Sequence, residues 1–472
     1  MAATISKKKI ILFIVSIVLA VGIAFIPTPE VMHPLGMRFV AIFMWLILLM
    51  TFKIFEEYLS VLFMLTALLA FRIAEPSYIF SQFTSATFWQ ILTILALAAA
   101  VRKTTVLTRL ALYFLKPFPP TYAGQIAALM LSGLFLSLLI PSIYAKILIL
   151  APIALTICDT AGYEKSSKPA TGMFLALFVT AYFLSNGFTT GNLNVQLSQA
   201  FIGFPMDFFE WLIAASVWTT VMSIGTYAII MLIYRPKNAP PMHKDYIKHM
   251  MDNLPPIGRN DKFAAVIMGI SLILWMSEGI TGISALMTNL LAVVAFAGVG
   301  VMTPEDFNNH VDWKLLIVIG GILSAAAFFV PFGITTWLAN TFRPILAPLT
   351  INPWIFVPSL VLVVMIAKYV LVTQIGNIAI FSAVFLPLVV PLGYHPFIVV
   401  QIANMANDFW STSYNNVMIK PAYNITQNRL VVYRDVQPMA YMLMVVMMIA
   451  FTLSIPLWRH IGFFDWWPGY YY

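Results

Sequence analysis

The chain is a succession of long apolar segments separated by short polar connections. A helix that crosses a bilayer needs about 20 apolar residues, so the pattern predicts an all-α integral membrane protein. The polar, proline-bearing connection 235–262 is the one long exception and predicts a linker. The apolar segments fall near residues 10–27, 38–53, 58–74, 88–101, 124–158, 170–203, 206–234, 263–280, 285–302, 313–330, 352–390, 395–420 and 436–457.

Two of these segments are too long for one crossing and carry a polar interruption near the middle. Segment 124–158 contains Pro141-Ser142, and segment 352–390 contains TQIGN, from Thr373 to Asn377. Each predicts a re-entrant helical hairpin, which enters the membrane and returns to the same side. Backbone that is not helical at this depth must face protein or water, because lipid cannot satisfy its N–H and C=O groups.

The two interrupted segments belong to an internal duplication. Trp89 and Trp313 lie in matching apolar stretches, FWQILTILALAAA and DWKLLIVIGGILS. The polar stretches SNGFTTGN and STSYNN start 96 and 98 residues after these tryptophans (185 − 89 and 411 − 313). We therefore predict an unwound helix within 170–203 and another within 395–420, in two halves of opposite orientation. Paired interruptions in inverted halves point to the substrate site of a secondary transporter.

Composition and charge agree with a membrane location. Hydrophobic residues make up 61% of the 472 residues and charged residues only 9%, so a water-soluble fold could not bury the apolar surface. The net charge of +8 is explained by Lys and Arg in cytoplasmic loops rather than by nucleic-acid binding. The same rule predicts a signal-anchor helix with a cytoplasmic N-terminus. The C-terminal tail is aromatic and nearly uncharged, which suits the outer interface and predicts a C-terminus outside. One cysteine excludes an internal disulfide, and the six histidines show no metal-ligand spacing.

The pattern divides the chain into five regions. Residues 1–120 and 263–347 are predicted scaffold helices, and 235–262 is predicted to be a cytoplasmic linker. Residues 121–234 and 348–472 are predicted to be the two halves of a transport domain. Each half combines one hairpin with one unwound helix.

Charged residues near the interruptions are expected to differ in role. Lys146 lies just after the first interruption, where a lysine costs roughly 2.5–3.5 kcal/mol on insertion scales, so we expect it to compensate substrate charge. Lys368, five residues before the second interruption, is equally compatible with a deep or a surface position. Arg102, Lys103 and Arg109 are expected to be solvated charges beside an interfacial amphipathic helix.

Polar residues at the interruptions form the candidate substrate site. Free N–H groups at the start of half-helices attract carboxylates. A single polar residue in a membrane helix often only bonds a neighbouring helix, but clusters mirrored in two halves favour a site. No metal, no cofactor and no nucleophile or nucleotide-binding signature is predicted, which argues against an enzyme or an ATP-driven pump. The predicted binding residues are Ser142, Ile143, Tyr144, Thr189, Thr190, Asn192, Thr373, Gln374, Ile375, Gly376, Asn377, Ser411 and Thr412.

From about Phe88 to Tyr423 the chain resembles the divalent anion:sodium symporter family, especially its exchanger branch. That branch includes bacterial citrate/succinate antiporters and plastid 2-oxoglutarate/malate translocators. Its first-tip motif, Pro-Ser-Asn-Thr-Ala-Arg, corresponds here to the residues from Pro141 to Lys146. Its second-tip motif corresponds to Tyr369 through Asn377, its unwound-helix motif to Ser185 through Thr190, and its later His-Tyr-Gly-Thr-Gly-Pro stretch to the region of Tyr414, Asn415, Asn416 and Pro421.

The resemblance implies about eleven transmembrane helices plus two re-entrant hairpins in an inverted repeat. It also implies a homodimer that moves substrate by an elevator-like shift. Ile143 and Gln374 replace the two motif asparagines, and Tyr144 and Ile375 replace threonines, which depletes the oxygens that would ligate sodium. Lys146 stands in the arginine position and can supply the positive charge that sodium brings, which favours exchange.

We therefore expect a sodium-independent antiporter of dicarboxylates such as 2-oxoglutarate, malate or succinate. The expected setting is a bacterial plasma membrane, with no nucleic-acid partner. A sodium-coupled di- or tricarboxylate symporter is the alternative within the same class, and sodium dependence of uptake in liposomes distinguishes it. A membrane-embedded enzyme or receptor is the alternative of another class, and absence of any transport would favour it.

Overall fold

The computed structural model describes residues 7–237, 245–369, 374–407, 409–412, 416 and 418–466, without the side chains of 345–347 and 375. Every regular element in these ranges is a helix, which confirms the predicted all-α fold. Several predicted features lie partly outside the described residues. The parts concerned are residues 238–244 of the predicted linker, residues 370–373 of the second-tip motif, Tyr414 and Asn415 of the later motif, and the tail from 467 onward.

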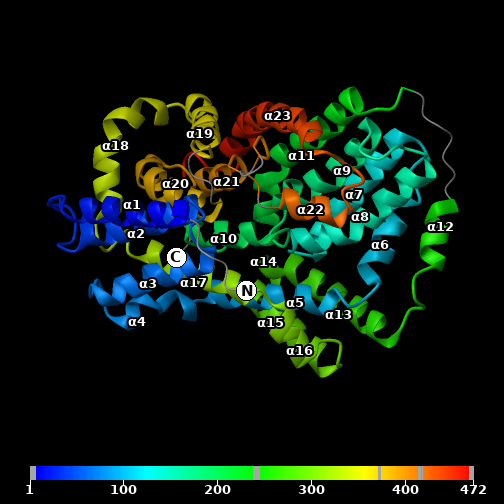
Figure 1. Ribbon diagram of the computed structural model, residues 1–472, viewed down its shortest axis with the longest axis horizontal. Helices are drawn as coiled ribbons and strands as arrows, with labels where there is room; N and C mark the ends of the chain where they lie inside the picture. The colour runs from blue at the N-terminus through cyan, green and yellow to red at the C-terminus, as the bar shows by residue number, and fades with distance from the viewer. Residues whose placement is uncertain are drawn as a thin grey trace.

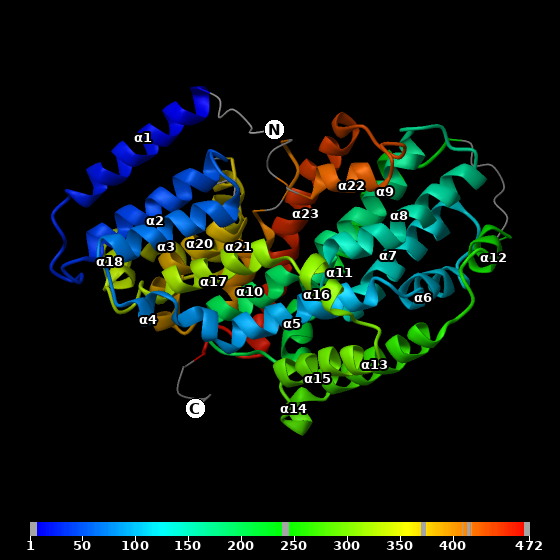
Figure 2. The ribbon, with the colours of Figure 1, turned by 60° about the horizontal axis from the view of Figure 1, so that its bottom comes forward.

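The amino-terminal helices pack side by side at one end of the molecule, together with a helix from the second half of the chain (Figure 1). Phe39 stacks on Phe328 with ring centroids 4.8 Å apart, inside a hydrophobic cluster separate from the main core. This partner helix contacts the third amino-terminal helix and also the arm of the second hairpin that follows its break, and these elements lie in the same half of the molecule in Figure 2. The group consists of α1 (Lys7–Ala24), α2 (Gly36–Thr51), α3 (Glu57–Ala70) and α17 (Trp313–Ala327).

A second group packs around α5 (Ala86–Val101), which contacts α15 (Ala285–Gly298). Helix α15 also packs against α13 (Arg259–Met276). Two sharp bends occur here. Helix α5 turns by 77° into α6 (Val106–Leu115), the predicted amphipathic helix, and α16 (Pro304–His310) turns by 62° into α17.

The first hairpin breaks where the sequence predicts. Helix α7 (Tyr122–Leu139) ends just before Pro141, and α8 (Ile143–Thr160) begins just after Ser142. Proline lacks an N–H and disfavours helical backbone in the residue before it. The two arms run back along each other, since the Tyr122 ring at the start of α7 lies 6.0 Å from the Tyr163 ring beyond α8.

The second hairpin breaks earlier than the sequence predicts. Helix α19 (Pro353–Ala367) ends six residues before α20 (Gln374–Val389) begins, so Gln374 to Asn377 form the first turn of α20. The prediction placed the interruption on these residues because polar groups and glycine interrupt an apolar run. Such residues also suit a helix start, where N–H groups lack intrahelical acceptors. The arms again reverse, since the Tyr394 hydroxyl donates to the Thr350 carbonyl over 2.7 Å.

Each hairpin is followed by an interrupted helix and then by a long helix. In the first half α9 (Lys168–Tyr182) gives way to the 3-10 turn η2 (Leu184–Gly187) before α10 (Leu193–Ile202). In the second half α21 (Pro396–Met405) stops well before α22 (Ile419–Ile425). The order of elements therefore repeats. The long helices, which pack along each other, are α11 (Phe208–Ile233) and α23 (Tyr433–His460).

Five helices in the described part of the chain are long and apolar enough to cross a membrane, or seven if each bent pair is one crossing. Arms α7 and α8 are among the five. The count of about eleven crossings, the re-entrant character of the hairpins and the inverted orientation of the halves stay predictions. The remaining elements are α4 (Pro76–Ile79), η1 (Ser81–Thr84), α12 (Asp245–Asp252), α14 (Glu278–Thr281), α18 (Ile334–Thr350) and η3 (Val390–Leu392).

Candidate functional site

The break in the first hairpin is held by side chains on both sides. The Ser142 hydroxyl accepts the Ala145 N–H over 3.2 Å and so caps α8. The Thr190 hydroxyl, from the interrupted helix, donates to the Leu138 carbonyl over 3.0 Å. This carbonyl lies in the last turn of α7, where carbonyl groups have no N–H donor within the helix. Both candidate residues therefore stabilise the break.

Lys146 lies fully buried behind this break. Its ammonium donates to the Gly191 carbonyl over 2.6 Å and to the Ser137 hydroxyl over 3.2 Å. A lysine in an apolar interior needs such acceptors. Lys146 thus ties the first hairpin to the interrupted helix, and charge compensation of substrate stays a prediction for it.

Asparagines cap the helices that follow the two interruptions in the same way. The Asn192 side-chain oxygen accepts the N–H groups of Asn194 and Val195, and the Asn416 side-chain oxygen accepts those of Met418 and Ile419. The two asparagines follow Trp89 and Trp313 by the same 103 residues (192 − 89 and 416 − 313). Asn192 therefore caps α10, and the substrate contact expected of it stays a prediction.

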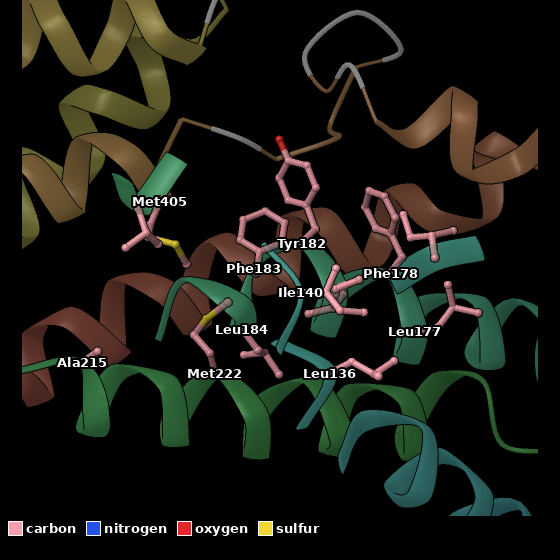
Figure 3. Packing of buried hydrophobic residues seen from close by; sticks show 14 of the residues in the cluster. Leu136, Ile140, Leu177, Phe178, Tyr182, Phe183, Leu184, Ala215, Met222 and Met405 are labelled. Carbon is pink, nitrogen blue, oxygen red and sulfur yellow. The ribbon is translucent and has the colours of Figure 1, made fainter. Parts of the chain in front are cut away.

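A chain of amides joins the two halves between the interruptions. The Asn404 amide donates to the Asn186 side-chain oxygen over 2.9 Å, and the Gln374 amide donates to Asn404 over 3.4 Å. The Tyr182 hydroxyl donates to the Gln374 oxygen, also over 3.4 Å. Figure 3 shows the Tyr182 ring in the hydrophobic cluster with its hydroxyl pointing away from it. Gln374 at the second hairpin is thus bound to both interrupted helices.

A cavity of about 410 Å³ lies between the first break, the amide chain and the helices α3, α5 and α17. Its volume is within the range of small-molecule sites. Glu57, Arg102, His310 and Asp312 on its wall are exposed, so solvent reaches it, whereas Lys368 is buried. The polar and charged lining residues are Glu57, Arg102, Ser142, Tyr144, Tyr182, Asn194, His310, Asp312, Lys368 and Gln374.

A second, smaller cavity of about 200 Å³ lies on the other side of the first break. Pro141 lines both cavities. Along α5 the smaller cavity extends from Ala86 to Leu97, and the larger one from Leu95 to Arg102, just beyond the helix. Thr189 and Thr190 line the smaller one, so the hairpin break lies between two spaces that overlap in the second half of α5.

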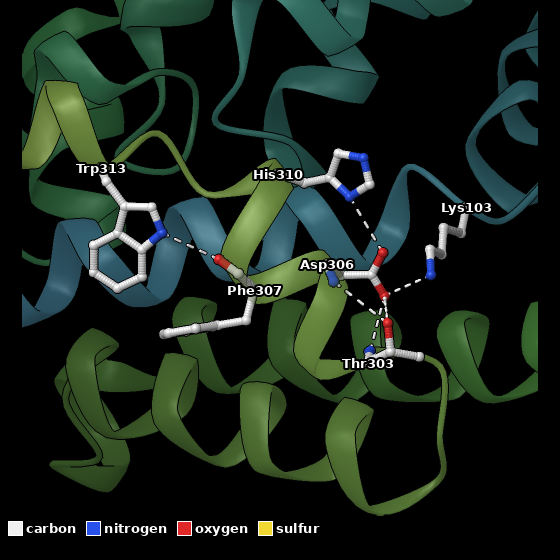
Figure 4. A network of polar contacts seen from close by, with 6 residues as sticks. All are labelled: Lys103, Thr303, Asp306, Phe307, His310 and Trp313. Carbon is white, nitrogen blue, oxygen red and sulfur yellow. Dashed lines mark hydrogen bonds and ion pairs between the residues drawn. The ribbon is translucent and has the colours of Figure 1, made fainter.

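Beside the larger cavity a network of polar contacts joins the end of α5, through Lys103, to α16 (Figure 4). Asp306 is almost completely buried and pairs with Lys103 over 2.5 Å and with His310 over 3.2 Å. The Thr303 hydroxyl also donates to Asp306, and the Trp313 indole donates to the Phe307 carbonyl. These contacts hold α16 and the start of α17 in place and so position His310 and Asp312 at the cavity.

The structure brings some of the predicted residues together at the larger cavity and places others elsewhere. Ser142, Ile143, Tyr144 and Gln374 line this cavity. Gly376 and Asn377 lie in the first turn of α20, where Asn377 is fully buried, and the backbone of Ile375 joins them. In the second interruption the Tyr369 hydroxyl donates to the Ser411 hydroxyl over 3.0 Å, and Thr412 follows directly.

The basic residues after α5 are partly solvated, as expected, and also make specific contacts. Arg102 and Lys103 are exposed. Arg102 lines the cavity, Lys103 pairs with Asp306, and Arg109 donates to the Pro255 carbonyl and to Thr105.

Sequence reasoning also left out several residues of the site. Tyr182, Asn194 and Asn404 lie beside the interruptions, and polar groups next to a predicted break were the available signal. Asn186 lies within the predicted motif stretch but was not among the predicted binding residues. Glu57 carried no comparable signal, since it precedes an apolar helix far from either interruption.

The family comparison decides the class of protein. A family model described as the sodium:sulfate symporter transmembrane region matches residues 7–463. The chain belongs to this family. The resemblance to divalent anion:sodium symporters is thereby confirmed, and the protein is a multi-pass membrane transporter rather than an enzyme.

Individual relatives of this symporter-family chain are distant but cover most of it. Dicarboxylate transporter 1, chloroplastic, of Spinacia oleracea is 25% identical over 394 residues, which is 81% of this chain and 69% of the relative. The putative malate transporter YflS of Bacillus subtilis is 24% identical over 356 residues, covering 72% of this chain and 73% of the relative.

Two solved structures share the fold. The YdaH transporter of Alcanivorax borkumensis matches with a TM-score of 0.56 at 14% identity, over 97% of this chain and 98% of that one. MtrF of Neisseria gonorrhoeae matches with a TM-score of 0.58 at 12% identity, over 94% of both chains. Identities this low show a common fold only.

Proposed function

We propose that this protein is a secondary active transporter that exchanges organic dicarboxylates, of the 2-oxoglutarate, malate or succinate type, without sodium. The names of the spinach and Bacillus relatives support the substrate class. The observation that carries the proposal is the presence of two cations, Arg102 and Lys368, on the wall of one cavity at the first hairpin break.

A dianion suits this cavity for two reasons. Arg102 can bind one carboxylate with two parallel hydrogen bonds, and Lys368 can neutralise the other. The first turns of α8 and α20 also begin at the cavity, with Ser142 and Gln374 on its wall. Helix starts carry a partial positive charge and free N–H groups, so both stabilise an anion placed between them.

Lys146 supports sodium independence. Its ammonium is held by a backbone carbonyl and a hydroxyl at the junction of two broken helices, which is the kind of oxygen environment that a monovalent cation uses. A covalently attached cation stays with the protein in every state. An empty carrier with this charge is costly to move through the membrane, which favours exchange over net transport.

The hairpin break between the two cavities suits alternating access. In our proposal the two hairpins and interrupted helices move together, elevator-like, past α3, α5 and α17, so that the site faces the smaller cavity's side after the movement. We assign the linker, the N-terminus and Arg102 to the cytoplasmic side because of their positive charges. Arg102 lines the larger cavity, so in our proposal this cavity faces the cytoplasm, and the transporter works as a homodimer.

Counterflow in proteoliposomes tests the proposal. Vesicles loaded with malate are expected to take up labelled 2-oxoglutarate, malate or succinate at the same rate in sodium and in choline medium. Citrate and sulfate serve as the tricarboxylate and inorganic competitors. Uptake that needs a sodium gradient and no internal substrate would establish the symporter instead, and transport of sulfate alone would refute the substrate class.

A further inference from the structure

Part of the wall of the smaller cavity consists of amides that are paired with one another. The Gln90 amide donates to the Gln196 side-chain oxygen over 2.7 Å, and the Gln196 amide donates to the Thr189 carbonyl, also over 2.7 Å. All three residues line the cavity. Gln196 is buried and has both ends of its amide satisfied by the protein, so it holds the wall together without needing a ligand.

Asn289 on the same wall differs, because one end of its amide has no such partner. The residue lies in α15 and is only 1% exposed. The Trp275 indole donates to the Asn289 side-chain oxygen over 3.0 Å, and both residues line the cavity. Since an indole can only donate, this bond fixes which end of the amide is the oxygen. The other end, an NH2 group with no hydrogen-bond partner among the described residues, is therefore a buried donor at the cavity.

A buried donor without a partner costs stability, and a ligand with an acceptor oxygen removes that cost. A carboxylate suits the Asn289 amide best, because hydrogen bonds to a charged acceptor are stronger than those between neutral groups. The volume of about 200 Å³ suits a ligand of a few carbon atoms rather than a drug-sized one. The site therefore matches a small carboxylate.

The charge of the wall sets the strength of binding. The described residues that line the smaller cavity include no Lys or Arg, and Glu278 is the one carboxylate among them. Glu278 is half-buried, and its side-chain oxygen accepts the Ala285 N–H over 3.0 Å. The larger cavity, by contrast, has Arg102 and Lys368 on its wall. A carboxylate in the smaller cavity meets one donor and one like charge, so it binds there more weakly.

We propose that the smaller cavity is a second binding site for a dicarboxylate, in which the Asn289 amide donates to one carboxylate and Glu278 weakens the binding. The identity of the ligand rests on the proposed function, in which the transport movement brings the substrate to this side of the hairpin break. Weak binding here lets the substrate leave, whereas two cations capture it in the larger cavity. A ligand held tightly in both cavities would be released slowly.

Protection of an introduced thiol measures binding in the smaller cavity without transport. Cys158 is the only cysteine of the chain and is buried, so Cys158→Ser provides an unreactive background. Ala86→Cys adds a thiol at an exposed position of the cavity wall. In detergent, malate is expected to slow the labelling of this thiol by a maleimide. Thr84→Cys, which is exposed and outside both cavity linings, should react at the same rate with and without malate.

Two substitutions in the Ala86→Cys background are expected to change the half-protecting malate concentration in opposite directions. Asn289→Asp keeps an acceptor for the Trp275 indole but removes the donor and adds a charge, so this concentration should rise at least about tenfold. Glu278→Gln removes the repulsion and should lower it about threefold or more. An unchanged concentration in Asn289→Asp, or a change in the same direction in both variants, would overturn the proposal.

Arg102→Gln distinguishes a second site from an indirect effect of the larger cavity. Arg102 lines the larger cavity and not the smaller one, so its loss should leave the half-protecting concentration unchanged. An increase as large as that of Asn289→Asp would show that malate acts from the larger cavity, which would overturn the second site. Counterflow without any protection would also refute the second site alone. Protection that depends on Asn289, without counterflow, would instead refute the proposed function and leave this site intact.

Discussion

Asn404 donates a hydrogen bond from its side-chain amide to the side-chain oxygen of Asn186 over 2.9 Å, although 218 residues separate the two. Each residue lies beside the interruption of its own half, and both are almost completely buried. The interrupted helices of the two halves of the chain therefore meet at one point. Gln374 bonds to the same Asn404, which brings the second hairpin to this junction.

Substituting Asn404 by Ala tests the importance of that junction. Loss of the amide leaves the Asn186 oxygen and Gln374 without this partner, which costs about 1–3 kcal/mol for each buried polar group. We expect a lower Tm in detergent and at least about tenfold slower counterflow. Asn424→Ala, at an exposed position of α22, is the control and should change neither quantity. Normal counterflow by Asn404→Ala would show that the two halves need no polar contact here.

Lys146→Met tests the buried cation at the first hairpin. The methionine side chain is unbranched and one atom shorter, and it lacks the donors to Gly191 and Ser137. Hydrogen bonds to a charged group are worth about 1.5–3 kcal/mol. We expect exchange in choline medium to fall at least about tenfold. Lys165→Met, on the exposed loop after α8, is the control. Unchanged sodium-free exchange in Lys146→Met would contradict a role of this charge in transport.

Arg102→Gln tests the first of the two cavity cations. Without the guanidinium the cavity loses a two-point contact with one carboxylate, so KM for dicarboxylates should rise about tenfold or more, while a monocarboxylate competitor gains relative affinity. The measurement is the substrate dependence of counterflow. Arg72→Gln, at an exposed position beyond α3, should leave KM unchanged. If both variants raise KM equally, Arg102 acts through overall charge and not through contact.

Asp261, in the first turn of α13, predicts a pH dependence of stability. Burial raises the pKa of this carboxyl, but N–H groups of Gly258 and Thr105, the Thr105 hydroxyl and the charge of Arg109 together lower it below its usual value of 3.8. A carboxyl whose pKa is lowered by folding stabilises the native state above its unfolded pKa, and this stabilisation is lost as the pH falls through the folded pKa.

Asp261→Asn is accordingly expected to lower Tm at pH 7, by an amount that reflects about 1–3 kcal/mol. The difference from the natural protein should shrink as the pH falls below about 4. Thermal unfolding in detergent across this pH range measures it. Asp252→Asn, an exposed residue of the linker helix α12, provides the comparison. A difference that stays constant down to pH 3 would show that the carboxylate charge is not the cause.

The positions of the helix breaks could be predicted from the sequence to different degrees. Pro141 removes a backbone donor and restricts its neighbour, so the first break is encoded locally and lies where expected. The second break has no proline, and Gln374 and Gly376 suit a helix start as well as an interruption. The prediction therefore placed the second break a few residues too late.

The sequence by itself determined that the chain is a membrane-embedded bundle of helices with two polar breaks in repeated order, because apolar length, proline and polar clusters act on the nearest turns of backbone. The tertiary structure alone decided which charges share the cavity. Glu57, Arg102 and Lys368 come from three distant segments, and their meeting depends on how α3, α5 and the second hairpin pack. The spacing of residues along the chain carries no information on such contacts, because they depend on how segments that are distant in the sequence pack against one another.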